Sequence, residues 1–220
     1  MTGTLFIVAT PIGNLEDITA RALRVMNEAD LIACEDTRRT RILLSHYNID
    51  RPTVSYHQHS QLAKLDFLIE ELKNGKSVAL VSDAGTPGIS DPGGVLVSSA
   101  IAAGISVVAV PGVSALTMLA SVAGIPMDKF VFLGFLPHKK GRATAFKKLA
   151  TSELPVIFYE SPHRVLKTLM VLAQFGGNVI VGRELTKKFE EVMRGTVQEA
   201  IEHFSEHKIQ GEFTIIYYRV

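Results

Sequence analysis

Short apolar runs alternate with segments of helical periodicity along the first half of the chain. Runs of four or five apolar residues between polar loops are typical of strands buried on both faces of a parallel sheet. The predicted strands are residues 5–9, 31–34, 53–56, 78–82 and 107–110. Between them, apolar residues recur every three or four positions, which predicts helices. The alternation indicates an α/β domain with a parallel sheet and right-handed crossovers.

The pattern changes after about residue 124, where strands follow one another with shorter helices between them. Strands are predicted here at residues 130–135, 155–159, 179–182, 191–194 and 212–219. Strands without long intervening helices indicate a mixed sheet. We therefore divide the chain into an N-terminal α/β domain, residues 1–116, and a C-terminal α/β domain, residues 117–220.

Three helix starts have recognisable cap signals. Asp17 stands where a carboxylate would cap the first helix. Ser161 and Pro162 predict a capped start with a first-turn proline for the helix that follows them. Thr196 with Glu199 has the spacing of a capping box. These signals predict where three of the helices begin.

A glycine-rich loop follows the fourth predicted strand. Residues 83–94 hold four glycines, two prolines and two aspartates. Glycine permits positive φ and close approach of the backbone to a ligand, and proline stiffens the turn. A loop between a parallel strand and a helix lies at the carboxyl edge of the sheet, where open α/β folds bind small molecules. The alternative is a tight turn in which Asp91 caps the next helix and Pro92 takes its first position.

Composition narrows the classes of protein further. The 220 residues are 47% hydrophobic with a formal net charge of +1, and Cys34 is the only cysteine. Apolar runs fall short of the ~20 residues that span a bilayer, and the chain enters its first strand without a basic leader. We therefore expect a cytoplasmic protein with no membrane span, no internal disulfide and no metal cluster. Because the net charge is so small, an inference that the protein binds nucleic acid must rest on local clusters of basic residues.

The common phosphate-binding fingerprints are missing from the sequence. The first strand–helix loop lacks Gly-x-Gly-x-x-Gly, and no Gly-Lys-Ser/Thr phosphate loop occurs. The glycine-rich loop contains Asp83 and Asp91 instead. Carboxylates repel a pyrophosphate and suit a neutral or cationic ligand that has amino or hydroxyl donors.

Seven motifs in order resemble the tetrapyrrole-methylase superfamily, and within it the branch that methylates a ribose of small-subunit ribosomal RNA. They are residues 10–19, 35–38, 82–93, 111–115, 134–137, 158–164 and 183–187. The resemblance runs from about residue 4 to the last strand. It implies two α/β domains with S-adenosylmethionine held in the cleft between them, and a homodimer. It also implies 2'-O-methylation of a cytidine in 16S ribosomal RNA.

The resemblance also implies the contacts of the cofactor. Carried over by motif, the residues are Pro11, Ile12, Ser82, Asp83, Ala84, Gly85, Ser114, Ala115, Tyr159, Glu160, Glu184 and Leu185. Ser114 could equally cap a helix and Tyr159 could be a core aromatic. Many relatives have an additional C-terminal tail after the strand that corresponds to the last strand of this chain. Docking of RNA by such a tail is therefore an open question.

Basic side chains gather in three segments beside the implied cleft. The predicted RNA-binding residues are Arg39, Arg41, Lys139, Lys140, Arg142 and Lys187. Each alone could belong to an ordinary solvated face. Three clusters on loops at one cleft predict a rim that binds phosphates.

Methyl transfer to a ribose hydroxyl is an in-line displacement, so positioning supplies much of the rate. A base or an oriented acceptor would assist the hydroxyl. The candidates are Asp36, His57, His59, Glu160 and Glu190, and we choose Asp36 with Arg38 as its charge partner. Two rival hypotheses stay open, a methyltransferase of a small tetrapyrrole-like substrate and a non-catalytic module that binds the ribosome.

Overall fold

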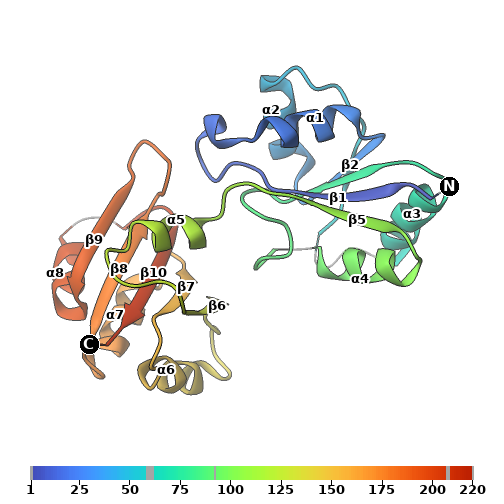
Figure 1. Cartoon of the computed structure of the whole chain (residues 1–220). Helices are drawn as coiled ribbons and strands as arrows, with labels where there is room; N and C mark the ends of the chain where they lie inside the picture. Colours follow the sequence, from blue (N-terminus) through green and yellow to red (C-terminus); the bar gives the residue numbers. More distant parts are fainter. Residues whose placement is uncertain (1, 58–61, 92, 207–208, 220) are drawn as a thin grey trace. The chain divides into compact units, whose positions relative to one another are not determined.

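A computed structural model describes residues 2–57, 62–91, 93–206 and 209–219. The chain forms two compact units, Met1–Ser114 and Ala115–Val220. The junction lies two residues before the boundary that the sequence pattern suggested, residue 116. Figure 1 shows the helices and strands of each unit.

The first unit is a five-stranded parallel sheet with the strand order β3-β2-β4-β1-β5. The strands are β1 (Thr4–Val8), β2 (Leu31–Cys34), β3 (Thr53–Ser55), β4 (Val78–Val81) and β5 (Ser106–Val110). The helices are the 3-10 turn η1 (Leu15–Asp17), α1 (Ala20–Glu28), α2 (Thr37–His46), α3 (Leu62–Lys73) and α4 (Gly94–Ala102). β2 and β4 are buried along their whole length, as their continuous apolar sequences predict. The predicted parallel sheet is confirmed.

Helices cover both faces of this sheet. Met26 of α1 and Leu44 of α2 pack with Ile32 and Val81 in one apolar cluster, whereas α3 and α4 contribute Leu68 and Leu96 to another. In Figure 1 the first pair of helices accordingly lies on one side of the sheet and the second pair on the other. Burying a large aliphatic side chain stabilises a fold by roughly 1.5–3 kcal/mol, so the two clusters fix which face each helix takes.

The cap prediction for α1 was wrong, and the alternative in which Asp91 caps α4 is also contradicted. α1 is capped by Thr19, whose Oγ1 accepts a hydrogen bond from Ala22 N at 3.0 Å, and not by Asp17. Asn14 caps a 3-10 turn before the helix, and Asp17 is the last residue of that turn. The N-cap of α4 is Gly93, which has no side-chain cap, so Asp91 does not cap this helix. Pro92 lies outside the described residues.

The second unit is a mixed five-stranded sheet with the strand order β6-β7-β10-β8-β9. The strands are β6 (Val131–Phe135), β7 (Val156–Glu160), β8 (Asn178–Arg183), β9 (Glu191–Thr196) and β10 (Phe213–Tyr218). The helices are α5 (Ala115–Ser121), α6 (Arg142–Ala150), α7 (Val165–Ala173) and α8 (Val197–Ser205). β6 and β7 run parallel, and the other pairs are antiparallel. The predicted mixed sheet is confirmed.

Of the two helix starts predicted in the second unit, one is confirmed and one was wrong. The capping box of Thr196 and Glu199 is confirmed at the start of α8. The cap of Ser161 with Pro162 was wrong, because Arg164 is the N-cap of α7. Residues 161–164 form a turn in which Arg164 N donates to Ser161 O at 3.0 Å, so the helix begins later.

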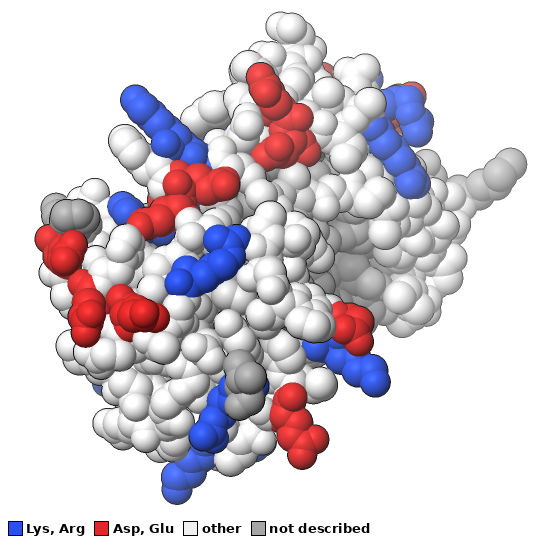
Figure 2. All heavy atoms as spheres, turned by 60° about the vertical axis from the view of Figure 1, so that its left-hand side comes forward, with Lys and Arg blue, Asp and Glu red and all other residues white. Residues whose placement is uncertain are grey.

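Charges of both signs are mixed on the molecular face in Figure 2, and no large area has one sign only. This agrees with the net charge of +1 and leaves electrostatic recognition to local groups. Among the described residues, no helix is both long and apolar enough to cross a membrane.

Candidate functional site

At the carboxyl end of β4, the chain continues to the opposite face of the sheet from the connections that follow the two neighbouring strands. β4 is flanked by β2 and β1. The chain leaves β1 and β2 toward the face covered by α1 and α2, whereas it leaves β4 toward the face covered by α3 and α4. Loops from neighbouring strands therefore separate at this edge. Such a switch point is where open α/β sheets hold ligands.

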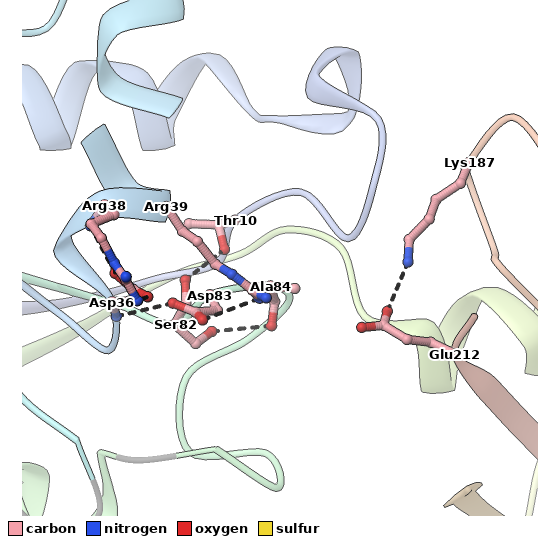
Figure 3. A network of polar contacts seen from close by, with 9 residues as sticks. All are labelled: Thr10, Asp36, Arg38, Arg39, Ser82, Asp83, Ala84, Lys187 and Glu212. Carbon is pink, nitrogen blue, oxygen red and sulfur yellow. Dashed lines mark hydrogen bonds and ion pairs between the residues drawn. The ribbon is translucent and has the colours of Figure 1, made fainter. Parts of the chain in front are cut away.

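Hydrogen bonds fasten the loop after β4 to the loop after β1. Thr10 N donates to Gly85 O at 2.9 Å, and Gly85 N donates to Thr10 O at 3.0 Å. Thr10 Oγ1 donates to Ser82 O at 3.2 Å, and Ser82 Oγ donates to Ala84 O at 3.2 Å (Figure 3). Gly85 has φ +80°, which a residue with a Cβ rarely adopts. The structure thus brings the predicted residues Pro11, Ile12 and 82–85 together.

The loop after β5 joins the same edge. A Cβ on Gly112 would lie 2.8 Å from the Cβ of Ala9, so the two loops approach at a distance that only glycine permits. Thr86 Oγ1 donates to Val113 O at 3.3 Å. The predicted residues Ser114 and Ala115 follow directly, at the junction of the two units.

Asp83 and Asp36 link the ends of β4 and β2. Asp36 N donates to Asp83 Oδ1 at 3.1 Å, and Arg39 Nη1 lies 3.3 Å from Asp83 Oδ2 (Figure 3). Asp36 is the N-cap of α2, and only Glu35 and Asp36 separate the end of β2 from this helix. Arg38 Nη2 donates to Asp36 Oδ2 at 2.7 Å, and Arg38 N to Asp36 Oδ1 at 2.8 Å.

These bonds decide what Asp36 can do chemically. Hydrogen bonds from the side chain and backbone of Arg38 lower the pKa of Asp36 to about 2. A carboxylate with so low a pKa accepts hydrogen bonds at neutral pH but takes up a proton poorly. Asp36 can orient a hydroxyl group, and it is a weak general base.

Two further carboxyls at this edge have raised pKa values. Burial raises the pKa of Asp91 to about 6, and the charges of Glu35 and Asp83 act in the same direction. Burial, followed by the charge of Asp83, also raises the pKa of Glu35. Carboxyl groups with shifted pKa values that gather at the carboxyl edge of a sheet are typical of functional sites. A ligand that brings positive charge or hydrogen-bond donors would relieve the repulsion among them.

Asp17, at the end of the 3-10 turn η1 after β1, is a further acidic residue of the first unit, and its sequence position had predicted a helix cap. Its Oδ2 is shielded from solvent and has no hydrogen-bond partner among the described residues. A buried carboxylate oxygen without a donor is costly, by roughly 1–3 kcal/mol or more, unless a ligand supplies the donor. Asp17 and Glu35 both lie inside the recognised motifs, which is the sequence signal that could have identified them.

Glu160 in the second unit has a different environment. Its side chain is completely buried, and its Oε1 accepts from Arg164 Nη2 at 2.7 Å and from Ser161 N at 2.9 Å. Thr168 Oγ1 donates to its Oε2 at 2.6 Å, and Arg142 Nη2 lies 3.8 Å away. Both oxygens are therefore occupied within the protein. The cofactor contact of Glu160 and the RNA contact of Arg142 stay predictions, and these side chains already have structural partners.

Tyr159 precedes this carboxylate on β7 and packs against two aromatic rings. Its ring centroid lies 5.2 Å from that of Phe132 and 5.4 Å from that of Phe135. Phe135 is 55% exposed, so Tyr159 belongs to an aromatic group near the surface rather than to the deep core.

The loop after β8 is closed by ion pairs. Lys187 Nζ lies 2.8 Å from Glu184 Oε1 and 3.0 Å from Glu212 Oε2, the second pair being drawn in Figure 3. Leu185 is buried, and its side chain packs beside Gly182. Lys187 thus has two carboxylate partners within its own unit, and its RNA contact stays a prediction.

Four of the predicted RNA-binding residues have exposed side chains. Arg39 and Arg41 lie on α2, and Lys139 and Lys140 precede α6. Of the other candidate bases, His57 and Glu190 are exposed, and His59 lies outside the described residues. Within the described part of the chain, no group of three or more His, Cys, Asp or Glu residues is arranged to hold a metal ion.

The chain is similar to known proteins over most of its length. Residues 4–201 match the family described as Tetrapyrrole (Corrin/Porphyrin) Methylases. The chain is 49% identical over 217 residues to the Ribosomal RNA small subunit methyltransferase I of Halalkalibacterium halodurans, covering 97% of this chain and 75% of that protein. It is 48% identical over 216 residues to the protein of the same name from Thermotoga maritima, covering 97% of each.

Among solved structures, the chain resembles a uroporphyrin-III C-methyl transferase from Thermus thermophilus complexed with S-adenyl homocysteine. The TM-score is 0.66 at 18% identity, with 97% of each chain covered. At this identity the likeness concerns the fold. The family match and the two close relatives go further, and the chain belongs to the tetrapyrrole (corrin/porphyrin) methylase family.

Proposed function

We propose that this chain transfers a methyl group from S-adenosylmethionine to the 2'-hydroxyl of a cytidine in 16S ribosomal RNA of the small subunit. The observation that carries the proposal is the identity of 48–49% over nearly the whole chain to relatives named ribosomal RNA small subunit methyltransferase I. The family's motifs supply the finer assignment to the ribose.

The acidic edge of the first sheet fits this cofactor. S-adenosylmethionine has a sulfonium and an ammonium group, and both suit the carboxylates of Asp83 and Asp91 and the unpartnered oxygen of Asp17. The glycine-rich loop offers backbone groups at close approach around Gly85. The residues that would hold the cofactor are Pro11, Ile12, Ser82, Asp83, Ala84, Gly85, Ser114 and Ala115, with Tyr159, Glu184 and Leu185 from the second unit. The bound cofactor supplies an electrophilic methyl group on sulfur.

Orientation is the main task of the protein in this reaction. An in-line displacement requires the hydroxyl oxygen, the methyl carbon and the sulfur to be aligned, and holding them so lowers the barrier. We assign this task to Asp36 and Arg38. Because the pKa of Asp36 is about 2, its carboxylate would accept a hydrogen bond from the ribose hydroxyl and direct the oxygen. As the oxygen bonds the methyl carbon and the sulfur keeps the electron pair of its broken bond, the hydroxyl proton would pass to water.

RNA would be held through its phosphates by exposed cations. Arg39, Arg41, Lys139 and Lys140 are exposed, and of these Arg39 also forms an ion pair with Asp83. Lys139 and Lys140 have no ion pair within the described residues, so their charges are available. Such contacts position the substrate and do not read its sequence.

A homodimer also belongs to the proposal. β6 is an edge strand whose Val131, Leu133 and Phe135 are 36%, 40% and 55% exposed. Exposed apolar side chains along a sheet edge favour burial against another chain. Sedimentation at micromolar concentration is expected to give a dimer, and a monomer would contradict this part.

The reaction is tested with small-subunit ribosomal RNA and labelled S-adenosylmethionine, followed by mass mapping of the modified nucleotide. A substrate with 2'-deoxycytidine at the mapped position is expected to accept no methyl group, because the acceptor oxygen is missing. Methylation of that deoxy substrate would contradict the ribose assignment. Methyl transfer to a small tetrapyrrole and not to RNA would favour a methyltransferase of a small tetrapyrrole-like substrate. Binding of RNA without methyl transfer would favour a non-catalytic module that binds the ribosome.

A further inference from the structure

We propose that the ring of Phe135 is a stacking surface for an unpaired base of the RNA substrate. The inference rests on the proposed function and adds a contact that the charged side chains cannot supply. Phe135 is the last residue of β6, which is an edge strand of the second sheet, and the residue is 55% exposed.

The first observation is an extra residue in β6 just before Phe135. Phe132 stands opposite Ile157 of β7. Two positions further along, a regular register would place Gly134 opposite Tyr159, whereas Phe135 stands there instead. The extra residue, with Gly134 at φ +59°, moves Phe135 to the face of Phe132, because side chains alternate along a strand. Bulges that redirect a side chain in this way are frequent beside active sites.

The second observation is the aromatic group that results. The ring centroid of Tyr159 lies 5.4 Å from that of Phe135 and 5.2 Å from that of Phe132. The next residue, Leu136, is buried in the core of the unit and anchors the end of the strand. The ring of Phe135 is therefore supported by a neighbouring ring while much of the residue stays open to solvent. A side chain held in this way loses little entropy when a base stacks on it.

The third observation is the charge of the segment that follows. His138, Lys139 and Lys140 come three to five residues after Phe135, and all three are exposed. Proteins that bind single-stranded RNA combine cations for the phosphates with aromatic rings for the bases. Because the family motif assigns Tyr159 to the cofactor, the stacked base would belong to the methylated nucleotide or to one of its neighbours.

Charge favours a base over a second copy of this chain at this ring. A twofold dimer contact repeats the same patch on both partners, so a contact centred on Phe135 would bring Lys139 and Lys140 toward the same lysines of the other copy. Like charges that face each other weaken an interface, whereas RNA brings phosphates that pair with them. The register agrees, because Phe135 does not share a face with the exposed Val131.

The test uses the absence of tryptophan from the sequence. Phe135→Trp introduces a single fluorescent reporter at the proposed contact, and a base that stacks on an indole quenches its emission. Small-subunit ribosomal RNA is titrated into this variant, while anisotropy of labelled RNA measures binding independently. Phe67→Trp, at a 45% exposed position of α3, is the control for quenching that does not need stacking.

Phe135→Leu removes the flat ring and keeps an apolar side chain. It is expected to weaken RNA binding about 5–20-fold and to leave the salt dependence unchanged, because stacking involves no phosphate. Phe135→Trp is expected to bind RNA within about twofold of the wild type and to be quenched by it. Phe67→Leu should change nothing, and all variants should bind S-adenosylmethionine within about twofold of the wild type.

Binding of RNA to Phe135→Trp without a change in its emission would overturn the proposal, and so would an unchanged RNA affinity of Phe135→Leu. Sedimentation that shows a dimer for the wild type and a monomer for Phe135→Leu would overturn it in favour of a subunit contact. An equal loss of affinity for S-adenosylmethionine would overturn it in favour of a support for Tyr159. Failure of the wild type to bind or methylate RNA would instead contradict the proposed function.

Discussion

Asp83 and Glu160 are two carboxylates in recognised motifs at the ends of buried strands, yet their surroundings differ. The side chain of Glu160 is fully buried and both of its oxygens have partners. Asp83 is partly exposed, and its ion pair joins Arg39, whose side chain is 68% exposed. A carboxylate whose partners are complete stabilises the fold, whereas one with spare capacity at an open edge can bind a ligand.

The local sequence explains much of this difference. Glu160 is followed by Ser161, Arg164 and Thr168, which the turn and the start of α7 bring back onto its oxygens. Asp83 is followed by a glycine-rich loop that contains no basic residue before Gly94. Its partners are Asp36, the N-cap of α2, which is 47 residues away, and Arg39 in the first turn of that helix. Variants at four places in the chain can break the comparison, and the largest effect is expected at Glu160.

Glu160→Gln is expected to cause the largest loss of stability. The substitution removes the charge that Arg164 and Arg142 share, and breaking a buried pair from one side costs about 3–5 kcal/mol. Urea unfolding monitored by circular dichroism measures the loss. Glu153→Gln, at an exposed position just before β7, is the matched control and should change little. A loss below about 1 kcal/mol would show that the buried pair contributes no more than a surface pair.

Asp83→Asn is expected to affect affinity and not stability. Asparagine can still accept the hydrogen bond of Asp36 N, so the variant removes mainly the charge. Loss of a charge-assisted bond should weaken S-adenosylmethionine by roughly 10–100-fold, while the exposed ion pair contributes at most about 1 kcal/mol to folding. Calorimetric titration measures this, with Asp66→Asn on the exposed side of α3 as the control. Equal affinity of variant and wild type would remove Asp83 from the cofactor site.

The basic segment before α6 allows the same comparison among cations. Lys139 and Lys140 are exposed, whereas Arg142 donates to Thr168 Oγ1 at 2.8 Å and to Pro137 O at 3.1 Å. Replacing both lysines by alanine should lower the salt dependence of RNA binding by about two units of slope and leave stability unchanged. Arg142→Ala should instead lower stability.

Fluorescence anisotropy at several salt concentrations measures the slope. The control replaces Lys73 and Lys76 of the first unit by alanine, which removes the same amount of charge. These two lysines form ion pairs with Glu70 and Glu71. An unchanged slope in the Lys139 and Lys140 variant would mean that these lysines do not contact RNA and belong to an ordinary solvated surface. Loss of stability in that variant would contradict the separation of these lysines from Arg142.

Features with local causes could be predicted from the sequence. β2 begins and ends where its apolar run does, and the capping box at Thr196 depends on residues three positions apart. The glycine-rich loop was recognisable because its composition alone is unusual. The cap at Asp17 was wrong because Asn14 begins a 3-10 turn that absorbs the residues before α1.

Features of the site that depend on distant residues could not be predicted. Arg142 reaches Glu160 across 18 positions, and nothing in either segment indicates the pairing. The free oxygen of Asp17 exists only through the burial that the whole fold creates. The raised pKa of Asp91 likewise depends first on its burial and then on the charge of Glu35, which belongs to another loop.

The smallest effect is expected at Asp91, and it depends on pH. Because the folded-state pKa is about 6 and an unfolded aspartate titrates near 3.9, the folded protein binds more protons than the unfolded chain between pH 4 and 6. Stability must therefore fall as the pH rises through this window, and the ionised carboxylate destabilises the fold above it. Asp91→Asn should remove the penalty and be more stable than the wild type by about 1–2 kcal/mol at pH 7.5, with a smaller difference at pH 4.5. Urea unfolding at both pH values measures this, and the exposed Asp50→Asn should show no such dependence. An Asp91→Asn protein that is less stable at pH 7.5, or that differs equally at both pH values, would mean that Asp91 has complete partners like Glu160.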